Sequence, residues 1–215
     1  MSDTVQRVAI EELVQLTTQV ALKRSIPHQR ASAAARHLAF CISHQLADSD
    51  VLETTLVALA PEQVPARPIS NKANCLIYTA KGQPTATNME DALSTFMHSD
   101  AEQLRIHETL CGVVAVAALA EIVTATGYSA SYYYINLDGK ERRIDIADSG
   151  QITGVSEPRE RTLAWNEVRV EKSSPTANCR PIKQMTDITH YQQQCQQHGV
   201  PIRVGLWQRM QVIAE

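Results

Sequence analysis

The sequence predicts an α+β fold, because its strand-like segments are grouped along the chain and do not alternate with helices. Residues 110–120 (LCGVVAVAALA) carry no polar side chain, and apolar residues recur at helical spacing over the first sixty positions. After Gly127 the apolar period changes to two, as in strands. We expect a helical N-terminal region over residues 1–60 and an α+β core region over residues 61–215, within one compact domain overall.

Three helices are expected in the N-terminal region, over about residues 8–26, 28–47 and 49–60. Pro27 separates the first two, Ser49 is a suitable N-cap for the third, and Pro61 ends it. Pro61, Pro65 and Pro68 then mark a connector that cannot be a regular helix.

The centre of the chain predicts one long buried helix. A short strand over residues 74–80 and a brief helix over 88–97 come first. Asp100 then caps a helix over about residues 101–126, and Gly127 follows at its C-terminus. Its apolar segment, residues 110–120, is too short to cross a bilayer, which takes about 20 residues. A helix that is apolar on every side belongs in a core.

A small antiparallel β-meander and C-terminal helices complete the prediction. Residues 129–137 and 142–147 alternate between apolar and polar side chains and flank Asp138-Gly139, a strong signal for a β-hairpin turn. Further strands are expected over residues 151–155 and 162–170. One helix is expected to begin near Asp187, and a final helix is expected near the C-terminus. The glutamine tract over residues 192–197, within the first of these, is the only segment of biased composition.

The composition excludes several classes of protein. Lys and Arg number 20 against 23 Asp and Glu, so no basic excess indicates nucleic-acid binding. No segment is long enough for a membrane span, and the acidic N-terminus does not look like a secretory signal. Five scattered cysteines without a CxxC pair favour reduced thiols. We therefore expect a cytoplasmic protein.

One group of side chains has the spacing of a metal site. His37, Cys41 and His44 lie at i, i+4 and i+7, on one face of the second helix, and could supply three zinc ligands. No fourth ligand is evident. Ordinary packing of Cys41 at the edge of the apolar face, with both histidines toward the polar side, explains them more simply. We predict no metal and keep these three residues as the candidate ligands.

Two further groups contain histidine and cysteine. His107 and Cys111 lie at i, i+4 with Glu108 adjacent, and a catalytic thiol would need such a base. In the long helix predicted above, Cys111 would lie about three turns inside and followed by apolar residues, so an inert core thiol is expected. Cys195 and His198 are also close in sequence, as part of a solvated helix face.

No catalytic motif is recognisable from the residues alone. The sequence contains no GxGxxG, GxxxxGK[ST], HExxH or GxSxG, and its eight glycines are too few for a typical phosphate-binding loop.

Two stretches nevertheless resemble a known family. VAIEELVQLTTQVALKRSIPHQRASAAARHLAF resembles the opening helices of malate/L-lactate dehydrogenase-like proteins, and GVPIRVGLWQRMQVIAE resembles their C-terminal end. The same stretches, with HETLCGVVAVAALAEIVTATGYSASYYYINLDGK, also resemble an uncharacterised bacterial family, a domain of unknown function.

The dehydrogenase resemblance implies a catalytic Ser-His-Gly motif after the second helix. Here Ser43-His44 is present, but Gln45 stands in place of glycine and the pair is expected inside the helix. We also expect the chain to be too short for that family's cofactor domain.

The leading prediction is therefore a ligand-binding or assembly protein without a catalytic set, acting with a protein partner or as a homo-oligomer, with no cofactor identified. The alternative is an NAD(P)-dependent oxidoreductase distantly related to the dehydrogenase-like family, acting on a small 2-oxo or imino acid. Its candidate catalytic residues are His44, His107, Glu108 and Cys111.

Overall fold

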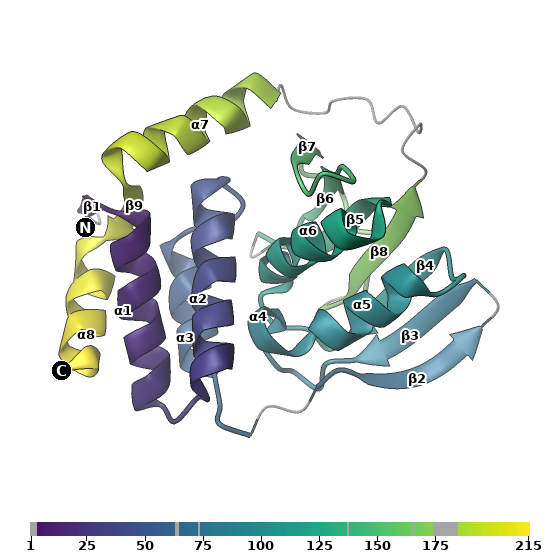
Figure 1. Cartoon of the computed structure of the whole chain (residues 1–215), viewed down its shortest axis with the longest axis horizontal. Coiled ribbons are helices and arrows are strands. Elements are labelled where there is room, and N and C mark those ends of the chain that lie inside the picture. Colours follow the sequence, from purple (N-terminus) through teal and green to yellow (C-terminus); the bar gives the residue numbers. More distant parts are fainter. Residues whose placement is uncertain (1–3, 63–64, 73, 137, 165, 174–184) are drawn as a thin grey trace. The chain divides into compact units, whose positions relative to one another are not determined.

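The computed structural model describes residues 4–62, 65–72, 74–136, 138–164, 166–173 and 185–215 (Figure 1). Its helices are α1 Ile10–Lys23, α2 His28–Ser43, α3 Ser49–Ala58, α4 Thr85–Asn88, α5 Glu90–His98, the 3-10 turn η1 Gly112–Val114, α6 Ala115–Thr126, α7 Met185–His198 and α8 Val204–Ala214. Its strands are β1 Val5–Val8, β2 Arg67–Lys72, β3 Cys75–Thr79, β4 Gln103–His107, β5 Ser129–Ile135, β6 Glu141–Ile146, β7 Ile152–Val155, β8 Val168–Ser173 and β9 Val200–Arg203. The predicted α+β class is confirmed.

The chain forms two compact units. Unit 1 contains residues 1–63 and 186–215, and unit 2 contains residues 64–185. Among the described residues, no helix combines the length and the apolar character that crossing a bilayer requires.

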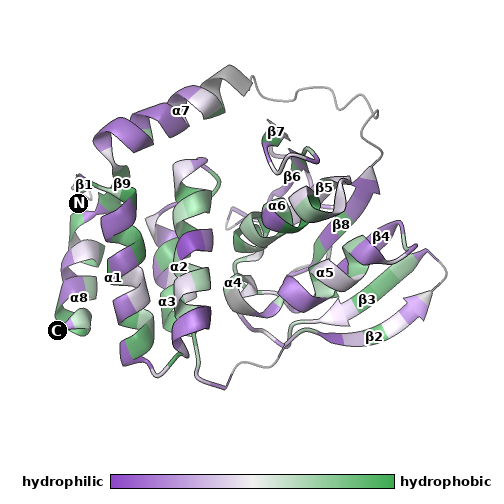
Figure 2. Cartoon of the chain, in the orientation of Figure 1, coloured by the Kyte–Doolittle hydropathy of each residue, from purple (hydrophilic) through white to green (hydrophobic). Residues whose placement is uncertain are grey.

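Unit 1 is built from helices and one short strand pair. Helix α1 packs against α2 and α8, and β1 pairs antiparallel with β9. The apolar side chains of the helices face inward, and the fully buried ones include Leu13, Leu38 and Leu52. Burial of these amphipathic faces is what stabilises helices of this length. Figure 2 shows α7 as largely hydrophilic, in agreement with its glutamine-rich sequence.

Three boundaries in unit 1 differ from the prediction. Val8 belongs to strand β1, not to the first helix. Helix α2 ends at Ser43 instead of residue 47, because Gln45 takes a positive φ that a helix cannot continue through. The N-cap of α3 is Asp48, whose side chain accepts hydrogen bonds from two amides of the first turn. Ser49, predicted as the cap, is the first helical residue.

Unit 2 contains a seven-stranded sheet in the order β2-β3-β4-β8-β5-β6-β7. Strands β3 and β4 are parallel, and every other neighbouring pair is antiparallel. The predicted meander is present as β5, β6 and β7, but it is part of this larger mixed sheet. Helices α5 and α6 lie side by side over one face (Figure 1).

The two faces of the sheet differ in polarity. One row across five strands is buried and mostly apolar: Leu76, Leu104, Val170, Tyr132 and Ile144. This face lies toward α6, since the Tyr132 hydroxyl donates to the Gly112 carbonyl at 2.5 Å. The adjacent row on the opposite face contains Arg105, Arg169 and Arg143 around Tyr133.

The prediction of one long central helix is correct in part. Residues 113–120 are buried, so the water-free environment predicted for this segment is confirmed. Helix α6, however, begins at Ala115, and residues 103–107 form strand β4. In β4 the sequence QLRIH alternates between half-buried and buried positions. The period of two was therefore visible, but the adjacent apolar run suggested one continuous helix.

Candidate functional site

The Ser43-His44 pair lies at the end of helix α2. His44 is the C-cap, and Gln45 follows in the left-handed conformation with a φ of 58°. The Leu46 amide donates to the Cys41 carbonyl at 2.9 Å, which closes the helix in the manner of a Schellman motif. His44 therefore lies at the helix terminus, not within the helix as predicted, and its side chain is half-buried.

Each nitrogen of the His44 ring has a neighbour. Nδ1 lies 2.7 Å from the Phe40 carbonyl oxygen, one helical turn earlier, and the two rings are stacked with centroids 3.9 Å apart. Nε2 contacts the side-chain nitrogen of Gln192, which comes from helix α7. A carbonyl oxygen can only accept, so Nδ1 must carry a proton. The ring is thus held by its own helix on one side and by α7 on the other.

The environment of His44 favours the neutral imidazole. Burial lowers the pKa of His44 from its ordinary 6.5, and the hydrogen bond to the Phe40 carbonyl acts in the opposite direction without cancelling this effect. At neutral pH the ring is therefore uncharged, with the proton on Nδ1 and a lone pair on Nε2. A neutral histidine with a defined basic nitrogen can act as a general base.

The candidate zinc ligands on α2 are separated by burial. His37 and Cys41 are 1% and 0% exposed, within the helical core of unit 1, whereas His44 lies at the helix end with the partners just described. The expectation that His37 lies toward the polar side is wrong. Over the described parts of the chain, no three His, Cys, Asp or Glu side chains are grouped to hold a metal ion.

His107, Glu108 and Cys111 lie in unit 2, where the structure corrects their predicted helix. His107 ends strand β4, and Glu108 and Cys111 both have positive φ, at 56° and 52°. Cys111 is the N-cap of η1, so it lies ahead of the buried helix and not three turns inside it. The Glu108 carboxylate accepts from the Thr79 hydroxyl at 2.5 Å.

These residues belong to a loop that is joined to the loop after β3. The Ala80 amide donates to the His107 carbonyl at 2.9 Å, and the Gly82 amide to the Glu108 carbonyl at 2.7 Å. In the other direction, the Leu110 amide donates to Gln83. Both loops follow the carboxyl ends of the parallel strands β3 and β4. In open α/β sheets, this edge is where ligands bind.

Backbone strain is concentrated at this edge. Of the six non-glycine residues with positive φ in the described chain, Lys81, Glu108, Cys111 and Asn166 lie here, since the Thr109 amide donates to the Asn166 carbonyl. A left-handed conformation costs such residues of order 1–3 kcal/mol, and it is found most often at functional sites. The edge of the sheet is therefore a second candidate site, within unit 2.

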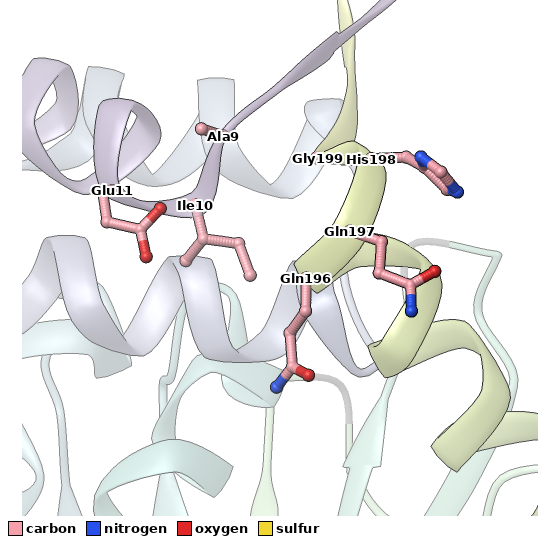
Figure 3. Close-up of a pocket in the computed structure, with 7 residues that line it drawn as sticks. All are labelled: Ala9, Ile10, Glu11, Gln196, Gln197, His198 and Gly199. Carbon is pink, nitrogen blue, oxygen red and sulfur yellow. The ribbon is translucent and has the colours of Figure 1, made fainter.

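The two members of the third histidine and cysteine group differ in burial. Cys195 is buried in α7, whereas His198 is exposed. Burial raises the pKa of the Cys195 thiol and of its neighbour Tyr191, the latter to about 12, so both remain protonated. A shallow cavity of about 310 Å³ lies between the first turn of α1 and the end of α7 (Figure 3). Figure 3 shows the His198 ring directed away from Glu11.

Sequence reasoning missed the groups that give these sites their geometry. Gln192 lies 148 residues from His44 in the sequence, and nothing in a glutamine tract indicates which residue it contacts. The Phe40 carbonyl is a backbone group and has no sequence signal. The pairing of β3 with β4 could have been inferred, because two alternating segments separated by a short helix form a parallel crossover.

Comparison with known proteins identifies the fold. No protein-family profile and no curated protein sequence matches the chain. Three solved structures are similar: a dehydrogenase from Sinorhizobium meliloti (12% identity, 99% of this chain, 100% of that chain, TM-score 0.67), malate dehydrogenase from Pyrococcus horikoshii OT3 (8%, 98%, 95%, 0.67) and delta1-piperideine-2-carboxylate reductase from Pseudomonas syringae (9%, 97%, 99%, 0.59). At such identities the likeness shows the fold alone.

These neighbours correct two predictions. The similarity covers nearly the whole of each neighbouring chain, so the expectation that this chain is too short for that architecture is wrong. The leading prediction, a binding or assembly protein, is overturned as well, because the proteins that share the fold are named dehydrogenases and reductases. Of the two family resemblances, the one to malate/L-lactate dehydrogenase-like proteins is supported, and the one to a domain of unknown function is not.

Proposed function

We propose that this protein is an NAD(P)-dependent oxidoreductase that acts on a small 2-oxo or imino acid, with His44 as the residue that transfers the proton. The observation that carries the proposal is the neutral, oriented His44 at the end of α2, in a fold shared with enzymes named for that reaction class. We place the protein in the cytoplasm, as expected for scattered cysteines without a CxxC pair.

His44 is suited to exchange a proton with an oxygen or nitrogen of the substrate. When a 2-hydroxy acid is oxidised, the hydroxyl proton moves to His44 Nε2 while the bond between hydrogen and carbon 2 breaks. A bound nicotinamide ring would accept that hydrogen with its two electrons. In the reverse direction, His44 must first be protonated, and it then gives the proton to the oxygen or nitrogen at carbon 2. Proton transfer of this kind contributes about 10²–10⁴-fold to a rate.

The edge of the sheet in unit 2 offers groups that fit a polar ligand. Gln83 Oε1 is buried and finds no hydrogen-bond partner among the described residues, so it can accept from an amide or hydroxyl of a ligand. No described atom lies within 4 Å of where a Cβ of Gly82 would be, which leaves its backbone open to close approach. The exposed Lys81 adds a positive charge for a phosphate. Lys81, Gly82 and Gln83 are therefore candidate ligand-binding residues of unit 2.

Gln45 replaces the glycine of the resembled motif without changing the backbone. Its φ of 58° is the conformation that glycine adopts most easily. The substitution therefore adds strain next to His44 but preserves the helix end that orients the ring. It does not argue against a catalytic role.

The test is turnover with NADH and NADPH against a panel of 2-oxo and cyclic imino acids, followed by the absorbance of the reduced nicotinamide. We expect activity with at least one substrate and a loss of about 10²–10⁴-fold in His44→Asn. The control is His28→Asn, since His28 is exposed at the first residue of the same helix and should leave the rate unchanged. Absence of turnover across the panel, or a His44→Asn variant as active as the unmodified protein, would refute the proposal.

A further inference from the structure

The side-chain nitrogen of Gln192 contacts the nitrogen of His44 that the proposed reaction requires. The contact joins α7 to the end of α2 within unit 1. Gln192 is half-buried, while the next residue, Gln193, is exposed and belongs to the same glutamine tract. The tract therefore directs one particular amide to the histidine.

The contact made by His44 Nδ1 decides which group donates in the hydrogen bond between His44 Nε2 and Gln192. Nδ1 carries a proton because it faces the Phe40 carbonyl at 2.7 Å. In a neutral ring Nε2 then has only a lone pair, and its neighbour must be a donor. The Gln192 amide group supplies an N–H to that lone pair. The opposite amide orientation would place oxygen against a lone pair, unless the half-buried ring were charged.

We infer that Gln192 is a positioning residue that occupies His44 Nε2 in the resting protein and yields it to the substrate; this rests on the function proposed above. A substrate hydroxyl can replace the amide one for one, because it too donates a hydrogen to the lone pair. The displaced amide keeps two N–H groups near the substrate, where they can donate to a carboxylate or carbonyl oxygen. At the neutral ring, ligands without a donor cannot make this exchange and leave a buried hydrogen bond unmade, which costs affinity. A 2-oxo acid, which has no donor, binds instead to the protonated ring, whose Nε2 then donates to its carbonyl oxygen.

The exchange also predicts which substrates are accepted. A 2-hydroxy acid offers a hydroxyl to Nε2 and a carboxylate to the freed amide. A carboxylic acid of the same size without the hydroxyl offers only the carboxylate. We therefore expect the site to discriminate by the hydroxyl and not by the length of the carbon chain.

The experiment measures acylation of His44 by diethyl pyrocarbonate, which reacts with an unprotonated nitrogen and is quantified by peptide mass spectrometry. It uses the full chain without substrate or cofactor. Gln192→Ala exposes the Nε2 lone pair, and we expect acylation to accelerate about 3- to 10-fold, the factor that corresponds to one ordinary hydrogen bond. Gln192→Glu places a carboxylate there, which favours the charged ring and slows acylation at neutral pH.

Gln193→Ala is the matched control and should react like the unmodified sequence. A merely structural role for Gln192 would not give opposite responses in the alanine and glutamate variants. Equal acylation rates in Gln192→Ala and Gln193→Ala, or faster acylation in Gln192→Glu, would overturn the inference. Because the assay needs no turnover, a failure of the proposed oxidoreductase activity would be seen separately in the substrate panel.

Discussion

One hydrogen-bonded carboxylate in each unit shows how burial changes what a polar group contributes to stability. In unit 1, the Asp48 carboxylate that caps α3 is exposed and accepts from two amides of the first turn. In unit 2, the Glu141 carboxylate is fully buried and accepts from Arg159, Thr162 and Leu163. Loss of the buried carboxylate in unit 2 should therefore cost more than loss of the exposed one in unit 1, and the following variants test this difference.

The largest effect is expected at Glu141, whose side chain is fully buried. Burial alone would raise the pKa of this carboxyl, but hydrogen bonds from Thr162, Arg159 and Leu163 outweigh it and lower the pKa below its usual range. Glu141→Ala leaves these donors without their acceptor, and a buried donor left unpaired costs about 1–3 kcal/mol of unfolding free energy. Urea denaturation of the full chain measures this cost.

A matched surface pair provides the control. Asp138 and Arg142 are bonded at 3.1 Å, with the Asp138 side chain 43% exposed. Asp138→Ala should cost at most about 1 kcal/mol, since exposed pairs contribute little and the Asp138 hydrogen bond from the Lys140 amide is also exposed. If the two variants are equally stable, the contrast between buried and exposed charge in unit 2 is incorrect.

The Glu141 carboxyl makes the stability of unit 2 depend on pH. The pKa of this carboxyl is lower in the folded than in the unfolded protein. It therefore stabilises the fold at pH values above its unfolded-state pKa, and this stabilisation is lost as the pH falls through its folded-state pKa. Acid should therefore destabilise the unmodified protein more than Glu141→Gln. Urea midpoints measured from neutral to acidic pH, with hydrogen exchange to locate the change in unit 2, would check this.

A smaller effect is expected at the start of α3 in unit 1. The Asp48 carboxylate accepts from the amides of Asp50 and Val51 at 2.9 and 3.1 Å. Asp48→Ala should cost about 1 kcal/mol, whereas Asp48→Asn keeps the cap and should cost little. A cost for Asp48→Ala that matches that of Glu141→Ala would remove the distinction between the units.

The smallest expected effect is an increase, not a decrease, in the free energy of unfolding. Gln45→Gly relieves the positive φ after His44 and should stabilise unit 1 by about 0.5 kcal/mol, the strain relieved less the entropy that glycine adds to the unfolded chain. Gln19→Gly, at an exposed position inside α1, should instead destabilise by about 1 kcal/mol. Thermal unfolding of both variants gives the comparison, and destabilisation by Gln45→Gly would show that the strain is absent.

How much the sequence could predict depended on whether the structural signal was local or came from a distant partner. The helices of unit 1 were found from amphipathic spacing and prolines, which are local signals. Strand β4 was missed because its five residues run into an apolar segment with helical character, and the sheet pairing that decides between them comes from β3 and β8. Strand β9 was missed for the same reason, since its partner β1 lies at the other end of the chain.

For the candidate sites, sequence identified the residue but not its surroundings. His44 was found through the resembled motif, while the tautomer of its ring depends on a carbonyl and an amide that have no sequence signal. His107, Glu108 and Cys111 were selected for a helical spacing that they do not have, yet they do lie at a strained edge of the sheet. Their residue types were informative and their assumed geometry was not.

The most direct test of the central claim is the pH dependence of kcat/KM in the oxidative direction, measured with the substrate found in the panel. Because burial lowers the pKa of His44, the rate should rise with pH through an inflection below the ordinary 6.5 and then level off. The inflection should vanish in the residual activity of His44→Asn. A profile without that inflection, or one that His44→Asn leaves intact, would show that another group transfers the proton.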